Sequence, residues 1–106
     1  MAVCVVLTTV GDLKTAQRLA RKLLSDKLSA CVTVVPKVVS YYRWKGKMER
    51  SNEALLLIKT NRRLWPQIQH FLKSNHPYSM PEVLALPVSF GSKEYLSWLG
   101  HCLKKK

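Results

Sequence analysis

Acidic residues are scarce in this chain of 106 residues, where six Asp and Glu against eighteen Lys and Arg give a net charge of +12. Such an excess of positive charge favours anionic partners, such as nucleic acid, a membrane surface or a phosphorylated ligand. The basic residues are scattered, however, over a helical face, a hairpin tip and the tail Lys104-Lys105-Lys106. Since no basic patch interleaved with aromatic residues is present, we do not expect specific nucleic-acid binding.

Paired cysteines and long apolar runs are also missing. Cys4, Cys31 and Cys102 form no CxxC pair, and an odd number of cysteines favours free thiols in a cytoplasmic protein. No apolar run approaches the roughly 18 residues of a membrane span. The first residues show neither the basic segment nor the cleavage site of a signal peptide. We therefore expect a cytoplasmic location without membrane association.

The motifs of several enzyme classes are absent, namely GxxxxGK(S/T), GxGxxG, HExxH and GxSxG. Glu49 and Glu53 are close in sequence, but we predict that both lie near a solvated strand end. An acylphosphatase-like site needs a phosphate-binding loop after the first strand, and Thr9-Val10-Gly11-Asp12 offers an acid and one glycine there. The strand expected over 53–58 has no aromatic platform for RNA. We therefore predict that the protein is not an enzyme.

The most informative segment present is a long predicted β-hairpin. Its first arm, Ala30–Trp44, is rich in residues that favour strands, and Gly46 supplies the positive φ of a two-residue turn. The second arm runs over Lys47–Thr60, and Pro36 predicts a bulge or a sheet edge in the first. About 14 residues at ~3.3 Å each span roughly 46 Å, whereas a domain of this size is only ~34 Å across. Part of the hairpin is therefore predicted to overhang the body.

The remaining elements predict one domain over residues 1–106. We expect strands at 2–10 and 82–88, and helices at 13–27, from Asn61 to Asn75, and from Gly91-Ser92 onward. The order β-α-β-β-α-β with an added helix is typical of the α+β, ferredoxin-like sandwich. The last helix is predicted to direct six residues inward on two sides: Tyr95, Leu96, Trp98, Leu99, Cys102 and Leu103.

The segment from Asn75 to Glu82 is the strongest candidate for chemistry. It places the imidazole of His76, the phenol of Tyr78 and the carboxylate of Glu82 around two prolines in a stiff loop. Such a cluster suits a metal ion or a small ligand. The alternative is that His76 and Tyr78 only hydrogen-bond the loop to the sheet. Both interpretations remain open on these residues alone.

Several motifs together resemble the divalent-cation tolerance family, CutA. They are Ala30-Cys31-Val32 with Val35-Pro36, Ser40-x-Tyr42-x-Trp44-x-Gly46-Lys47, Glu53 with Leu57-Ile58-Lys59-Thr60, His76-Pro77-Tyr78 with Pro81-Glu82, and Leu86-Pro87-Val88 with Gly91 and Tyr95-Leu96-x-Trp98. The resemblance covers nearly the whole chain. It implies a ferredoxin-like protomer in a tight homotrimer, similar in architecture to the PII signalling proteins.

The resemblance also implies a range of functions. Bacterial members are linked to tolerance of copper and other divalent ions, and animal members to acetylcholinesterase processing or anchoring. Members with metal sites use a Cys at the end of the first strand and two adjacent His before Pro-Tyr. Here the matching positions carry Thr8, Asn75 and His76, so only one of these ligands is kept, and Ser79 replaces a frequent Glu. Cys4 lies four residues from Thr8, about 13 Å along a strand, and cannot replace it.

We therefore predict a non-enzymatic, trimeric CutA-like protein that binds a metal ion, such as Cu(II) or another divalent cation, or a small ligand at a cleft between subunits. His76 is the predicted metal ligand. Glu82 and Lys59 are the predicted charge pair of the cleft, and Trp44 and Tyr78 its aromatic walls. The alternative is a basic module for interaction or anchoring, related to acetylcholinesterase in animals or binding polyanions without sequence preference.

Overall fold

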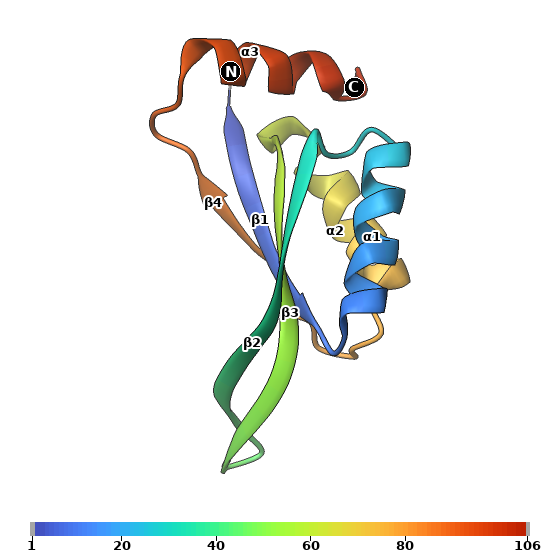
Figure 1. Cartoon of the computed structure of the whole chain (residues 1–106), viewed down its shortest axis with the longest axis vertical. Helices are drawn as coiled ribbons and strands as arrows, with labels where there is room; N and C mark the ends of the chain where they lie inside the picture. The colour runs from blue at the N-terminus through green and yellow to red at the C-terminus, as the bar shows by residue number, and fades with distance from the viewer. Residues whose placement is uncertain (1, 106) are drawn as a thin grey trace.

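Four antiparallel strands form one sheet, with two helices on one face and a third across the strand ends (Figure 1). This computed structural model describes residues 2–105, so Met1 and Lys106, the ends of the predicted domain, lie outside the described residues. The order of the strands in the sheet, β2-β3-β1-β4, confirms the predicted ferredoxin-like fold. The elements are β1 Val3–Val10, α1 Leu13–Ser25, β2 Cys31–Trp44, β3 Lys47–Asn61, a 3₁₀ turn Arg62–Leu64, α2 Trp65–Asn75, β4 Leu84–Pro87 and α3 Lys93–Cys102.

The core lies between the sheet and the helices α1 and α2. Alternate residues of β1 and β3 face this side, and they share one buried cluster with the inner stripes of both helices. Each fully buried aliphatic side chain stabilises the fold by about 1.5–3 kcal/mol. The fully buried aliphatic members include Val6, Val10, Leu19, Leu23, Leu56, Ile58, Ile68 and Leu72.

Helix α1 begins as predicted and ends two residues early. The Asp12 carboxylate accepts a hydrogen bond from the Thr15 backbone N–H at 2.7 Å, which makes Asp12 the N-cap. Lys27, the predicted last residue, has a φ of 55° and therefore cannot continue a right-handed helix. The Leu28 N–H bonds to the Leu23 carbonyl at 3.0 Å and closes this end.

The overhang of the hairpin is confirmed. Strand β1 pairs only with 54–61 of β3, so 47–53 pair with β2 alone and extend beyond the body (Figure 1). The molecule is accordingly elongated, measuring 44 × 26 × 23 Å. Lys45 and Gly46 form the turn with φ of 51° and 79°, as a type I′ turn requires.

The bulge predicted at Pro36 is also confirmed. Val35 pairs with Leu55 and Val38 pairs with Glu53, so two residues of β2 lie opposite the single residue Ala54. The second of the two, Lys37, has a φ of 58°. Proline donates no ladder hydrogen bond, and an extra residue in an edge strand accommodates it.

The C-terminal part differs from three predictions. Strand β4 is four residues long instead of covering 82–88, because it pairs only with 4–7 of β1. Asn61 caps the 3₁₀ turn, accepting from the Arg63 N–H at 3.0 Å, and does not cap α2 directly. Tyr95 and Trp98 of α3 are 43% and 46% exposed, so their predicted inward orientation is wrong within one chain, whereas Leu99 is buried. A ten-residue helix that packs against the body along one stripe leaves the side chains of its other face exposed.

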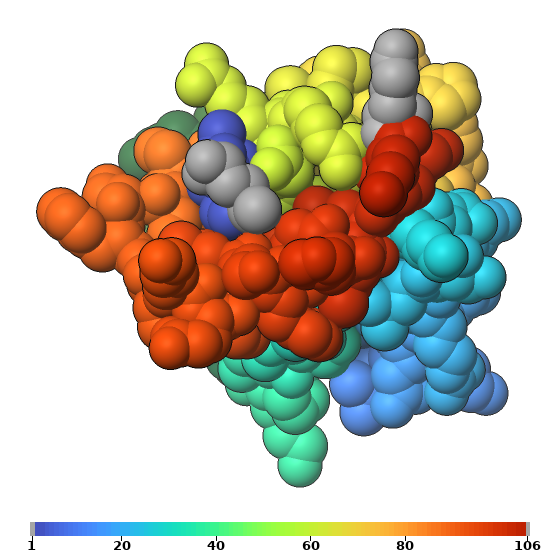
Figure 2. Space-filling view, turned by 90° about the horizontal axis from the view of Figure 1, so that it is seen from above, coloured from blue at the N-terminus to red at the C-terminus, as the bar shows by residue number. Residues whose placement is uncertain are grey.

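Helix α3 covers the end of the molecule opposite the hairpin tip (Figure 2). The Lys104 backbone N–H bonds to the Lys27 carbonyl at 2.9 Å, and Arg63 donates to the Lys104 carbonyl at 2.7 Å. These bonds fix the chain after α3 to the segment after α1 and to the 3₁₀ turn. Within residues 2–105, no helix has the length and apolar character needed to cross a membrane.

Candidate functional site

A cleft of about 690 Å³ lies where the base of the overhanging hairpin meets the loop after α2. This volume is within the range of ligand-binding clefts. Three segments supply its walls: the end of β1, the hairpin and the loop. The lining residues are Thr9; Ser40, Tyr41, Tyr42, Trp44 and Glu53; and Tyr78, Ser79, Met80, Pro81 and Glu82.

Glu53 is the charged residue of this cleft that the sequence analysis did not assign to it. Its side chain is only 8% exposed, and one carboxylate oxygen accepts a hydrogen bond from the Tyr78 hydroxyl at 2.8 Å. The predicted solvated position is therefore wrong, because Glu53 lies where β3 enters the body and the loop covers it. One signal could have indicated this: Glu53 directly precedes the apolar run 54–58.

Tyr78 links the loop to the hairpin through its hydroxyl. Burial, and then the hydrogen bond to Glu53, raise the pKa of Tyr78 to about 12. The phenol therefore keeps its proton at neutral pH and donates a hydrogen bond to the carboxylate. A buried carboxylate with such a charge-assisted partner costs far less free energy than an unpaired one.

Aromatic side chains of β2 form the opposite wall. The Tyr42 hydroxyl lies 2.7 Å from the Ser51 hydroxyl across the hairpin, a hydrogen bond that fixes the ring of Tyr42. Trp44 lies two residues further along β2, so both side chains are on one face of the strand. Both are exposed, and they leave ring surface open to the cleft.

His76 lies beneath the loop and does not line the cleft. Its Nδ1 accepts from the Tyr78 backbone N–H at 3.1 Å, so the proton is on Nε2, which donates to the Thr9 carbonyl at 2.9 Å. Burial lowers the pKa of His76 and keeps the ring neutral. Both ring nitrogens are occupied in holding the loop to β1, which agrees with the second interpretation of this loop and leaves neither nitrogen for a metal.

The side chains at the other two positions of the implied metal site, Thr8 and Asn75, are also surrounded by other atoms of the protein. Thr8 is fully buried on the core face of β1, and within residues 2–105 its hydroxyl finds no hydrogen-bond partner. The Asn75 amide donates to the Phe71 carbonyl at 2.8 Å. Burial raises the pKa of the Cys4 thiol, so this cysteine is not an available thiolate. Among residues 2–105, no three His, Cys, Asp or Glu side chains are arranged to hold a metal ion.

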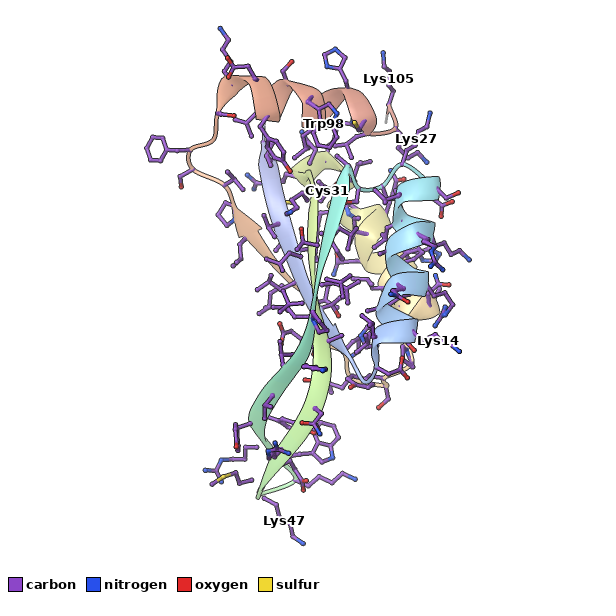
Figure 3. All side chains as sticks on the ribbon, in the orientation of Figure 1. Lys14, Lys27, Cys31, Lys47, Trp98 and Lys105 are labelled. Carbon is purple, nitrogen blue, oxygen red and sulfur yellow. The ribbon has the colours of Figure 1, made fainter. Side chains whose placement is uncertain are left out.

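Lys59, the predicted partner of Glu82, is not brought to the cleft of its own chain. Its ammonium donates to the Thr33 hydroxyl at 2.6 Å and approaches the Cys31 sulfur at 3.5 Å. Six residues of β3 separate Lys59 from Glu53, which is roughly 20 Å. Figure 3 shows Cys31 at the end of the sheet far from the hairpin tip. The structure thus brings together Trp44, Tyr78 and Glu82 of the predicted cleft residues.

Comparison with known proteins gives consistent matches. The sequence model of the family described as "CutA1 divalent ion tolerance protein" matches residues 4–102. The chain is 43% identical over 95 residues to divalent-cation tolerance protein CutA of Thermus thermophilus, covering 90% of this chain and 92% of that protein. It is 46% identical over 100 residues to the Escherichia coli protein of the same name, covering 94% and 89%. The crystal structure of CutA1 from Oryza sativa superimposes with a TM-score of 0.96 at 40% identity, covering 100% of this chain and 97% of that one.

Proposed function

Since the chain belongs to the CutA1 divalent ion tolerance family, we propose that it is a non-enzymatic homotrimer that receives a cation in the cleft between the hairpin and the loop. The supporting observation is the charge of the cleft. Two of the six acidic residues, Glu53 and Glu82, line it, and no Lys or Arg within residues 2–105 does. In a chain of net charge +12, this separation of charge makes the cleft a local site for cations.

Divalent metal ions are the cations that the family name implies. The residues at the implied ligand positions do not fit a tight site, because they supply a core hydroxyl, a bonded amide and an imidazole with both nitrogens used. The carboxylates of the cleft are oxygen donors, and oxygen donors bind Cu(II) or other divalent ions without the strength of a site built from thiolate and imidazole. We therefore place weak divalent-ion binding at Glu53 and Glu82.

Isothermal calorimetry with copper(II) tests this placement. We expect weak binding that falls further in Glu53→Gln, which removes the charge and keeps the shape. The matched control is Glu94→Gln on α3, outside the cleft, and we expect its affinity to equal that of the unmodified chain. Equal losses in both variants would place the ion elsewhere.

The trimer is proposed from the exposed apolar surface. On the hairpin, Tyr41 and Met48 are 68% and 77% exposed, and on the opposite edge of the sheet Leu84, Leu86 and Phe90 are exposed as well. Apolar surface of this extent marks interfaces. A head-to-tail ring, in which each hairpin lies on the next subunit, covers every overhang and closes. The number three comes from the family resemblance.

Light scattering during size exclusion tests the trimer. We expect a mass of three times 12.1 kDa that persists on dilution. Tyr41→Glu on the hairpin is expected to dissociate the trimer, whereas Leu24→Glu, at an exposed position of α1, is expected to leave it intact. Since three chains of +12 repel one another, added salt is expected to stabilise the assembly. A folded monomer of the unmodified chain at micromolar concentration would contradict the proposal.

A second function is favoured by helix α1. Its solvent face carries Lys14, Arg18, Arg21 and Lys22, and the helix contains no acidic residue. Lys14, Lys27 and Lys105 lie along the same side of the molecule (Figure 3). This face suits an acidic protein, as in the anchoring function of animal members, or a polyanion bound through charge alone. Replacement of the four α1 residues by Gln is expected to abolish heparin retention, and unchanged retention would rule this function out.

We also propose a cytoplasmic location, because Cys4, Cys31 and Cys102 are all free thiols. Reduced cysteines are typical of that compartment. Thiol labelling of the protein from fractionated cells tests the location, and recovery in an oxidised, extracytoplasmic fraction would contradict it.

A further inference from the structure

The walls of the cleft are aromatic to a degree that simple metal binding does not require. Tyr42 and Trp44, on one face of β2, and Tyr78 from the loop supply three of its eleven lining residues; Tyr41, also among them, is on the other face of the strand. The chain has only nine Phe, Trp and Tyr in total. Aromatic rings offer no lone pairs for a metal ion, but their faces carry negative electrostatic potential.

Charge is distributed in the cleft in a way that complements these rings. Glu53 lies at the base, almost completely buried, and Glu82 lies in the loop at the edge. Tyr78 donates a hydrogen bond to one oxygen of Glu53 at 2.8 Å, and the charge of this carboxylate attracts cations into the cleft. Among residues 2–105, no Lys or Arg lines the cleft, so the described part of one chain supplies no cationic side chain there.

We infer that this cleft binds an organic cation, a methylated or alkylated ammonium group that lies against Tyr42, Trp44 and Tyr78 with Glu53 as its counter-charge. The inference rests on the proposed function, because it names the ligand class of the same cleft. Aromatic faces with a carboxylate are the chemistry that recognises quaternary ammonium ions.

Other ligand classes fit the cleft less well. A phosphorylated or carboxylated ligand would meet two carboxylates and, among residues 2–105, no cationic side chain. A bare divalent ion needs several converging oxygens and would have to lose tightly held water to contact the rings. A quaternary ammonium ion is weakly hydrated and contacts rings through its methyl groups. The volume of about 690 Å³ leaves room for a substituent larger than this head group.

The test compares choline with its neutral isostere 3,3-dimethylbutan-1-ol, which has the same shape without the charge. Binding is followed in solution through the indole N–H signal of Trp44 in heteronuclear NMR spectra of the full chain. We expect choline to shift this signal to saturation. The isostere is expected to bind at least about tenfold more weakly, since only the cation is stabilised by the rings and by Glu53.

Two variants test the aromatic ring and the counter-charge separately, and calorimetry measures how tightly each variant binds choline. Trp44→Leu keeps an apolar side chain and removes the ring, and we expect it to weaken choline binding by about tenfold. Glu53→Gln removes the counter-charge, with a loss of similar size. Trp98→Leu is the matched control: Trp98 has nearly the same exposure as Trp44, 46% against 43%, and lies on α3 at the other end of the molecule (Figure 3). Its choline affinity is expected to stay unchanged.

The outcomes distinguish this inference from the proposed function. Equal binding of choline and the isostere, or equal losses in Trp44→Leu and Trp98→Leu, would overturn the inference. Copper binding that depends on Glu53, without any choline binding, would support the proposed metal function and overturn the inference. Choline binding that requires Trp44, in a chain that gives no copper heat, would support the inference and overturn metal binding in the cleft. Trp44→Leu keeps the test valid even if Glu53→Gln fails to fold.

Discussion

The hydrogen bond between Tyr78 and Glu53 gives the sharpest quantitative prediction. Tyr78→Phe removes only the hydroxyl that donates to Glu53 at 2.8 Å and leaves the carboxylate buried without this donor. A lost hydrogen bond to a buried charged group costs about 1.5–3 kcal/mol. We therefore expect the free energy of unfolding at neutral pH to fall by about 2 kcal/mol.

The same bond predicts a dependence on pH. The pKa of Tyr78 rises from 10.0 to about 12 in the folded protein, so this tyrosine stabilises the fold fully below pH 10. The stabilisation is lost as the pH rises toward 12, because the unfolded chain releases the phenolic proton first. A pKa change of this size corresponds to about 2.7 kcal/mol of folding free energy. Since Tyr78 is 37% exposed and solvent screens the interaction, we expect about 1–2 kcal/mol of this to be observed.

Urea unfolding at one protein concentration measures both effects. The difference in unfolding free energy between the unmodified chain and Tyr78→Phe is expected to shrink between about pH 9 and about pH 11.5, as Tyr78 loses its proton. Tyr95→Phe, which removes the hydroxyl of an exposed tyrosine on α3, is the control and is expected to show no such change. A difference that stays constant over this range, or equals that of Tyr95→Phe, would refute the reasoning.

Three further predictions concern metal ions, nucleic acid and the hairpin turn. Copper(II) is expected to bind the unmodified chain weakly, and Thr8→Cys combined with Asn75→His is expected to strengthen binding well beyond either change alone, since thiolate and imidazole replace a hydroxyl and an amide. Tight copper binding that requires His76 in the unmodified chain, measured by calorimetry, would contradict this. Any nucleic-acid binding is expected to weaken steeply with salt and to be equal for unrelated sequences; a fluorescence titration that finds one sequence strongly preferred at physiological salt would contradict it. Gly46→Ala is expected to lower the free energy of unfolding by about 1 kcal/mol, because φ is +79° although no atom lies within 4 Å of the added methyl. Gly46→Asn is expected to cost less in the same urea experiment, and equal costs would show that conformation is not the cause.

The fold could be predicted because its main features depend on local chemistry. The residues of the two hairpin arms favour strands, Gly46 determines the turn, and Pro36 marks the bulge. The overhang followed from chain length alone, since two strands of this size exceed the width of the body. The bounds of β4 could not be predicted, because β4 pairs only with residues 4–7 of β1 although β1 continues to Val10, and sequence patterns carry no information on that register.

The candidate site could be predicted only in part, because it depends on contacts between distant segments. Tyr78 and Glu82 are in one distinctive loop and were found, but Glu53 is 25 residues away from Tyr78 and has no local motif of its own. Lys59 lies at the other end of β3 from the cleft of its own chain, and its predicted place in a cleft between subunits stays a prediction. Tyr95 and Trp98 were assigned inward through their hydrophobicity, which does not distinguish a buried core from the exposed face of a helix.

The bulge in β2 determines what the hairpin presents to the cleft. Before it, Val34 pairs with Leu56 on the core side; after it, Tyr42 pairs with Glu49 and therefore lies on the same side as Glu53. Without the extra residue, the side chains of the outer half would exchange faces, and Tyr42 and Trp44 would point away from the carboxylate. The number of residues in the bulge, rather than the chemical identity of Pro36 or Lys37, thus determines on which face of β2 the aromatic rings lie. Substitutions in the outer half of β2 can adjust this surface gradually, but a one-residue insertion or deletion at the bulge would replace it with the opposite surface in a single step.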